Sequence, residues 1–119
     1  MAISGNKGDW SEIYTLFKLL GEGKVYAGDA DMNKLELYYP ILNVIREESK
    51  KYEYKPNVDQ HIVVIDEDGN EFARISMNKF LEESSKLLTE IKAANDPAFE
   101  IPATESFMTE IGCSKLKAP

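Results

Sequence analysis

Hydrophobic positions recur every three to four residues between 7 and 20 and predict a helix near the N-terminus. Gly21 and Gly23 follow and supply the backbone freedom that ends helices. On a helical projection Glu12 falls inside a broad apolar arc, between Leu16 and Leu19. We therefore expect Glu12 to be buried. The arc comprises Trp10, Ile13, Tyr14, Leu16, Phe17, Leu19 and Leu20.

Short runs of β-branched, aromatic or alternating residues predict strands at 24–28, 37–46, 51–55, 61–65 and 71–75. Pro40 cannot donate a ladder hydrogen bond, so its strand should lie at a sheet edge or begin near the proline. The sequence DEDGN at 66–70 is rich in turn-forming residues and predicts a hairpin loop between the last two strands.

A second helix is predicted over 77–91, with charged residues on one side and an apolar face that should lie on the sheet. Its apolar face contains Met77, Phe80, Leu81, Ser84, Leu87, Leu88 and Ile91. Residues 93–106 contain two prolines and are predicted to be a linker, and a short amphipathic helix over 105–111 should stop at Gly112.

Together these elements predict an α+β fold with an N-terminal helix, a small, mostly antiparallel sheet of about four to five strands, an amphipathic helix on that sheet and a short C-terminal helix. We expect a single domain over 1–112. Residues 113–119 should begin a segment that leads to a further part of a longer protein, because the extended sequence CSKLKAP has nothing to anchor it.

Composition narrows the class of protein. The 119 residues, 43% of them hydrophobic, suffice for one modest core. No apolar run reaches the roughly 18 residues of a membrane span, the N-terminus does not resemble a signal peptide, and the lone Cys113 suits a reducing cytoplasm.

The net charge of −7 argues against general binding of nucleic acid by phosphate neutralisation. However, Lys50, Lys51 and Lys55 lie close together in sequence, and the last seven residues contain two lysines and no acid. A basic strip on an acidic body is therefore compatible with the sequence, as is an ordinary solvated surface.

Glu12 has two explanations. Asp9 precedes it by three residues, as in a capping box with Asp9 as the N-cap. If the Leu16–Leu19 side is covered by protein, however, capping does not offset the several kcal/mol that burial of an unpaired carboxylate costs. A metal ion or a basic partner would then be needed.

The other candidates for chemistry have structural explanations. His61 lacks a second metal ligand or a serine partner, DEDGNE at 66–71 fits either a hairpin turn or an incomplete calcium loop, and Cys113 is expected to be a partly buried thiol. The sequence contains no glycine-rich phosphate loop and no Asp followed by an (Asp/Glu/Ser)-x-Lys strand. We find no complete active site, which leaves an independent small-molecule enzyme without support.

An ordered series of segments resembles the N-terminal portion of the HpaII-like type II restriction endonucleases, from about residue 5 to residue 118. The segments are GNKGDWSEIYTLFKLL (5–20), GKVYAGDADMNK (23–34), YYPILNVIREE (38–48), ISMNKFLEES (75–84) and IGCSKLKAP (111–119).

The resemblance implies a site-specific deoxyribonuclease that uses Mg²⁺ to cut double-stranded DNA at a short palindrome, CCGG for the prototype. In enzymes of the PD-(D/E)xK type a helix glutamate often joins the metal-binding acids, and Glu12 is the matching position for catalysis and metal binding. The Asp and x-Lys motif is absent, so the resemblance implies that this fragment is inactive by itself.

For contacts with the DNA backbone the same resemblance leads us to expect a set of basic residues, each of which is otherwise a solvated charge. They are Lys7, Arg46, Lys50, Lys51, Lys55, Lys115 and Lys117. The alternative function is a non-enzymatic acidic module for protein interaction or dimerisation, because YYPILNVI (38–45) would expose apolar surface at an unpaired sheet edge. A homodimer is one form that this pairing could take.

Overall fold

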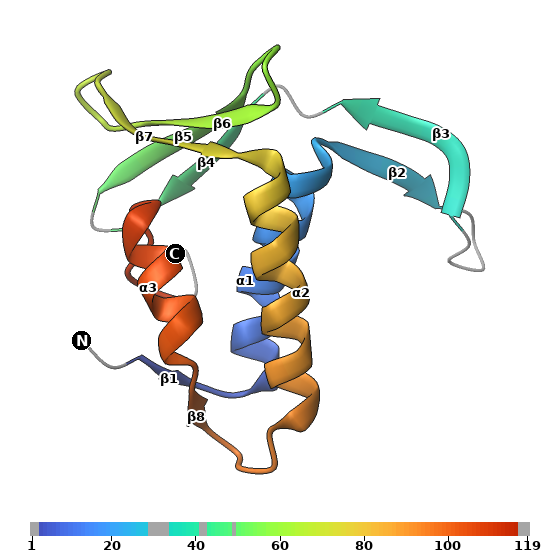
Figure 1. The fold of residues 1–119 in the computed structure, drawn as a ribbon, viewed down its shortest axis with the longest axis vertical. Coiled ribbons are helices and arrows are strands. Elements are labelled where there is room, and N and C mark those ends of the chain that lie inside the picture. Colours follow the sequence, from blue (N-terminus) through green and yellow to red (C-terminus); the bar gives the residue numbers. More distant parts are fainter. Residues whose placement is uncertain (1–2, 29–33, 41–42, 49, 117–119) are drawn as a thin grey trace.

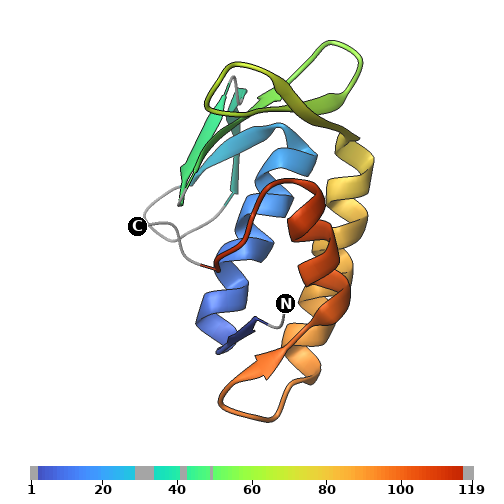
Figure 2. The same ribbon diagram turned by 90° about the vertical axis from the view of Figure 1, so that its left-hand side faces the viewer.

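The structure is a computed structural model that describes residues 3–28, 34–40, 43–48 and 50–116. In these residues three helices stand side by side and a four-stranded sheet lies across one end of them (Figures 1 and 2). The elements are Ser4–Gly5 (β1), Lys7–Glu22 (α1), Lys24–Gly28 (β2), Lys34–Pro40 (β3), Val44–Glu47 (β4), Lys51–Pro56 (β5), His61–Ile65 (β6), Glu71–Ser76 (β7), Met77–Ala93 (α2), Phe99–Glu100 (β8) and Pro102–Glu110 (α3).

The main sheet has the strand order β4-β5-β6-β7, and all its neighbours are antiparallel. The turn between β6 and β7 is the predicted hairpin loop: Asp66 Oδ1 accepts hydrogen bonds from the amides of Asp68 and Asn70, and Gly69 adopts φ +84°. Two further pairs of antiparallel strands, β2 with β3 and β1 with β8, lie outside the main sheet.

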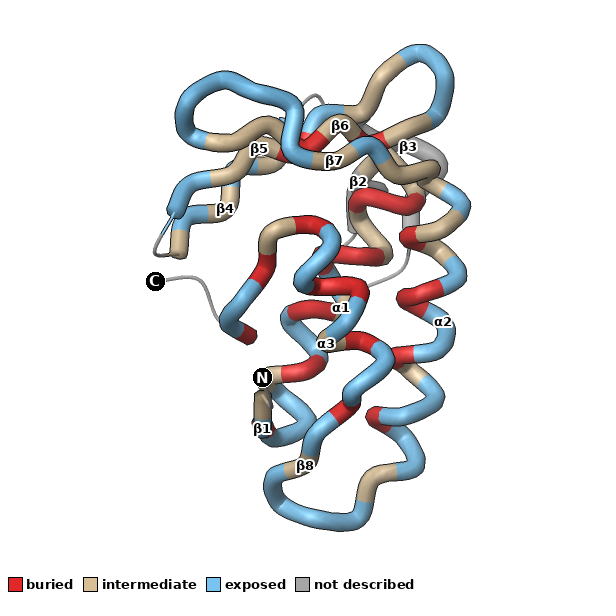
Figure 3. The backbone as a smooth tube through the Cα atoms, turned by 60° about the vertical axis from the view of Figure 1, so that its left-hand side comes forward, coloured by how far each residue is buried: buried red, intermediate tan, exposed pale blue. Residues whose placement is uncertain are grey.

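The hydrophobic core lies where the three helices face one another and beneath the sheet (Figure 3). Phe17 of α1, Phe80 of α2 and Phe107 of α3 meet edge to face, with ring centroids 5.1–6.1 Å apart. Helices α1 and α2 approach closely at Gly21, where an added Cβ would lie 2.7 Å from Leu81 Cγ and 2.9 Å from the Leu81 amide nitrogen. Each helix thus contributes one ring to a shared centre.

The predicted fold class is confirmed, with differences in two segments. The single strand expected at 37–46 is two strands: β3 ends at Pro40 and pairs with β2, whereas β4 pairs with β5 in the main sheet. The expected linker at 93–106 contains β8 and the start of α3, because Pro102 occupies the beginning of the helix, where its missing amide hydrogen is not needed. Helix α2 packs chiefly along α1 and reaches the sheet through β7.

The capping residue of α1 also differs from the prediction. Asn6, not Asp9, is the N-cap: its Oδ1 accepts a hydrogen bond from the Asp9 amide at 2.8 Å, and Asp9 Oδ2 accepts one from the Asn6 amide at 3.0 Å. Glu12 is therefore outside the capping box. In the described part of the chain, no helix has the length and apolar character that a membrane span requires.

Candidate functional site

Glu12 is exposed to solvent, so the prediction that it is buried is wrong. The buried stripe of α1 is narrower than its hydrophobic arc, because Tyr14 and Leu19 are only half-buried and Glu12 lies outside the stripe. Among the described residues no three His, Cys, Asp or Glu side chains come together as a metal site. One exposed carboxylate does not meet the coordination needs of Mg²⁺, so these residues alone do not form a metal centre.

The structure gathers some of the predicted basic residues at the turn between β4 and β5. Arg46 Nη2 donates a hydrogen bond to the carbonyl oxygen of Lys115 at 2.6 Å. The backbone amide of Glu48 donates to the Lys50 carbonyl, and Lys51 is paired with Glu47 across the two strands. Lys50, Lys51 and Lys115 are exposed. We call Lys50, Lys51 and Lys115 the hairpin cluster.

The remaining predicted cations lie elsewhere. Lys7 is exposed at the first residue of α1, and Lys55 lies toward the other end of β5, where its Nζ is 3.3 Å from Glu53 Oε2. No hydrogen bond or ion pair found in the described ranges joins Lys7 or Lys55 to the hairpin cluster. Lys117 lies outside the described residues.

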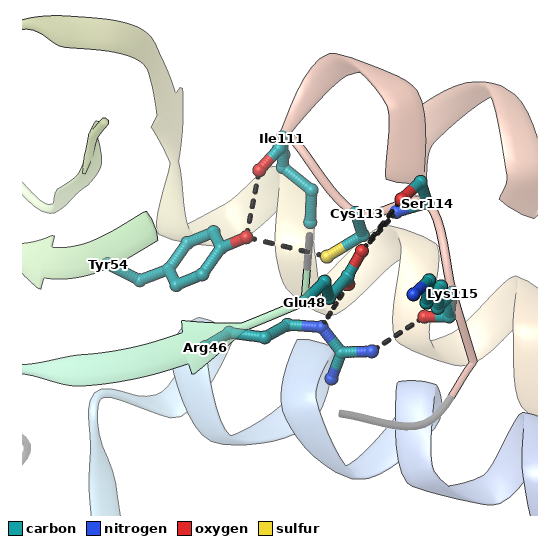
Figure 4. A network of polar contacts seen from close by, with 7 residues as sticks. All are labelled: Arg46, Glu48, Tyr54, Ile111, Cys113, Ser114 and Lys115. Carbon is teal, nitrogen blue, oxygen red and sulfur yellow. Dashed lines mark hydrogen bonds and ion pairs between the residues drawn. The ribbon is translucent and has the colours of Figure 1, made fainter. Parts of the chain in front are cut away.

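Arg46 differs from the three lysines because its guanidinium is held inside the protein (Figure 4). Its Nε donates to Glu48 Oε2 at 2.6 Å, and only 10% of the Arg46 side chain and 4% of the Glu48 side chain are exposed. With Nη2 bonded to the Lys115 carbonyl, this arginine links β4 to the segment that follows α3. The structure therefore gives Arg46 a structural role that the sequence did not predict.

Glu48 is the other residue that sequence reasoning missed. Its Oε1 accepts hydrogen bonds from the Ser114 amide at 2.9 Å and the Ser114 hydroxyl at 2.8 Å. Burial alone would raise the pKa of Glu48, but the hydrogen bonds from Arg46 and Ser114 outweigh it and hold the pKa below its ordinary value. The sequence held one signal for this ion pair: Arg46 and Glu48 are two positions apart, and residues at that spacing in an extended chain lie on the same side.

A neutral contact lies next to this ion pair. The hydroxyl of the fully buried Tyr54 donates to the Ile111 carbonyl at 2.9 Å and lies 3.4 Å from Cys113 Sγ. Burial raises the pKa of both the Tyr54 phenol and the Cys113 thiol. Cys113 was expected to be a partly buried thiol; it is almost fully buried, and its raised pKa favours the protonated form, which is unsuited to nucleophilic attack.

A small pocket of about 270 Å³ opens between the sheet and the end of α3. Tyr52 and Phe72 meet edge to face on its wall, with ring centroids 5.0 Å apart. Its lining consists of Glu48, Lys50, Tyr52, Phe72, Thr109, Gly112, Cys113 and Ser114. The lining does contain one hydroxyl–carboxylate pair, Ser114 Oγ and Glu48 Oε1 at 2.8 Å, but Glu48 is held in an ion pair with Arg46 and the pKa of its carboxyl is lowered, which makes it a weak base for activating that hydroxyl. His61 does not line this pocket; its Nδ1 lies 3.0 Å from the Asp59 carbonyl oxygen.

Comparisons with known proteins place this chain in a family of DNA-cutting enzymes. It belongs to the HpaII restriction endonuclease family, whose sequence model matches residues 6–119. The chain is 42% identical over 119 residues to the type II restriction enzyme HpaII of Haemophilus parainfluenzae, in an alignment that covers 97% of this chain. The alignment covers 32% of that enzyme, in its N-terminal portion, so the chain spans about a third of the relative's length. No solved structure matches the chain.

The environment of Glu48 predicts a pH-dependent stability. A carboxyl whose pKa is lowered by folding stabilises the protein fully above its ordinary pKa of 4.5, and this stabilisation is lost as the pH falls through the folded value. We expect Glu48→Gln to lower the free energy of unfolding by about 2–3 kcal/mol at neutral pH and by less as the pH falls below about 4. Urea denaturation at a series of pH values measures the difference.

Glu71→Gln is the matched control, because Glu71 Oε1 also accepts from an arginine, Arg74, at 2.8 Å, but in an exposed pair. It should change stability little at any pH. Equal losses in the two variants, or a Glu48→Gln loss that does not vary with pH, would contradict the assignment.

Proposed function

We propose that this chain forms the N-terminal part of a type II restriction endonuclease that acts in the cytoplasm on double-stranded DNA. The observation that carries the proposal is the family match over residues 6–119, together with 42% identity to the N-terminal portion of a type II restriction enzyme. The proposed reaction is hydrolysis of the DNA backbone at a short palindrome, with CCGG as the candidate sequence and Mg²⁺ as the candidate metal.

Within this enzyme, the proposed contribution of residues 3–116 is a scaffold and a DNA-backbone contact. The described residues do not assemble a metal site, so we expect this chain alone not to cleave DNA. The exposed lysines of the hairpin cluster favour contact with phosphates, because lysine is a mobile point charge that neutralises them without reading the bases.

A homodimer is the second proposal, and a specific feature supports it. β4 is an edge strand of the main sheet, and its residue Ile45 is 55% exposed. Edge strands with apolar side chains are common sites of pairing between chains. If two copies pair there, light scattering should give a molecular mass that rises toward twice that of the chain with concentration, and Ile45→Lys should abolish the rise. A constant monomer mass would exclude this pairing.

The backbone-contact proposal predicts that Lys50→Glu combined with Lys51→Glu weakens duplex binding at low salt. Loss of two phosphate contacts should also reduce the slope of log affinity against log salt by about 2. Fluorescence anisotropy with a duplex at several salt concentrations measures both quantities.

Lys86→Glu combined with Lys92→Glu is the control, because it changes the net charge equally on the exposed side of α2. It should affect the affinity and the salt slope much less. The same loss in both double variants would mean that only overall charge matters and would refute a contact at the hairpin cluster.

We propose Glu12 as a metal ligand on the basis of the family resemblance. Because its carboxylate is exposed, it could bind a metal ion together with acidic residues from another part of the enzyme. In the complete enzyme we expect Glu12→Gln to slow DNA cleavage by about 10–100-fold, because a metal ligand is lost, with little change in duplex affinity. Cleavage and binding assays on the same preparation separate the two effects.

Glu90→Gln, an exposed acid of α2, serves as the control and should leave both properties unchanged. Cleavage by Glu12→Gln within a few-fold of the unmodified enzyme would identify Glu12 as an ordinary surface acid.

A further inference from the structure

The segment that follows α3 is held by contacts with α3, with the β4–β5 hairpin and with the start of the chain. We call residues 111–116 the strap. Gly112 turns the chain at φ +84°, the Cys113 amide donates to the Met108 carbonyl at 2.8 Å, and the Leu116 side chain is buried. An added Cβ on Gly5 would lie 2.3 Å from Leu116 Cδ1, so the strap reaches the start of the chain.

Arg46 and Glu48, which we call the clamp, make three hydrogen bonds to the strap. Glu48 accepts two from Ser114, and Arg46 donates one to the Lys115 carbonyl (Figure 4). Two of these contacts involve backbone atoms, so they fix the position of the strap main chain as well as its side chains. The residues joined are 66 and 69 positions apart in sequence.

The clamp is built differently from an ordinary surface ion pair. Exposed pairs contribute little because water competes for both groups. Here both charged side chains are almost sealed from solvent, and Arg46 uses two nitrogens of its planar guanidinium in two directions, toward Glu48 and toward the strap. Such a network has one favourable geometry and therefore specifies a direction for the strap.

The clamp also connects two parts of the protein that the proposed function involves, the β4–β5 hairpin and the strap. It lies in the β4–β5 hairpin, whose Lys50 and Lys51 belong to the hairpin cluster, and it holds the segment that carries Lys115. In the relative, the alignment with this chain covers the N-terminal portion and about two-thirds of the enzyme lies outside it.

We propose that Arg46 and Glu48 are positioning residues that lock the strap onto the β4–β5 hairpin and so set the orientation of the following part of the endonuclease relative to the hairpin cluster. This inference rests on the proposed function. Neither residue is assigned to the reacting atoms. Their effect on cleavage would come through the direction in which the chain leaves this domain.

Hydrogen–deuterium exchange on this chain tests the first half of the proposal. In Glu48→Gln and in Arg46→Lys, the Ser114 amide, which donates to Glu48 Oε1, should exchange on the order of tenfold faster, whereas the amides of β6 and of the α1–α2 core should not change. Arg46→Lys keeps the charge but cannot make both contacts. Glu71→Gln is the control and should leave the strap at its original rate. Unchanged strap exchange in both clamp variants would overturn the proposal.

A second variant separates the clamp from general destabilisation. Ile62→Val removes one methyl group from a fully buried residue of β6 and should lower the melting temperature without loosening the strap. If Ile62→Val speeds strap exchange as much as Glu48→Gln does, the strap simply follows global stability and the clamp is refuted.

DNA cleavage by the complete enzyme tests the second half. Glu48→Gln and Arg46→Lys should lower the single-turnover cleavage rate at least about tenfold while duplex affinity stays within a factor of about two, because orientation and not contact is lost. Ile62→Val and Glu71→Gln should cleave like the unmodified enzyme at a temperature where all variants are folded.

The outcomes are distinguishable. Faster strap exchange with normal cleavage would overturn the positioning role. An unmodified complete enzyme that does not cut DNA would overturn the proposed function and with it the positioning role, whereas the exchange measurement would still decide whether the clamp holds the strap.

Discussion

A carboxylate that is nearly sealed from water is stable in its charged form only if hydrogen-bond donors replace the lost solvent, and Glu48 is such a group. Its donors come from two distant parts of the chain: Arg46 in β4, and the amide and hydroxyl of Ser114 beyond α3. The network closes only when the β4–β5 hairpin and the strap are both in place. This requirement makes the end of the described chain part of the folded domain and not a loose extension.

The helix layer determines where the hairpin and the strap can meet. Phe17, Phe80 and Phe107 make three pairwise ring contacts, so α3 cannot shift without disturbing α1 and α2. The C-terminal end of α3 then places the Ile111 carbonyl at the hydroxyl of the buried Tyr54. Since Tyr54 lies on β5, the same contact fixes the sheet over the helices and brings the hairpin to within hydrogen-bonding distance of the strap. Apolar packing thus positions the polar network.

The sequence predicted features with local causes well. The hairpin of β6 and β7 follows from turn residues at 66–70, and α2 follows from a regular apolar spacing. It failed where two local signals overlap: Asn6 and Asp9 each have an acid three residues later, and only the observed start of α1 selects Asn6. The exposure of Glu12 depends on which sides of α1 other elements cover. The role of Glu48 depends on Ser114, 66 positions away, and no single local pattern contains that information.

The clamp also bears on how an acidic chain could contact DNA in the proposed function. The net charge of −7 is spread over the whole protein, whereas a phosphate responds mainly to charges within the screening length of about 8 Å at physiological salt. At the β4–β5 turn, Glu48 is turned inward and neutralised by Arg46. Glu47 and the lysines of the hairpin cluster remain exposed there, and Lys51 also lines a pocket with Glu53, Asp66 and Glu67. Because the Glu48 side chain is buried and paired with Arg46, its negative charge is taken off the surface, and no exposed lysine is needed to neutralise it. The geometry that holds the strap therefore also lowers the negative charge that this turn presents to solvent.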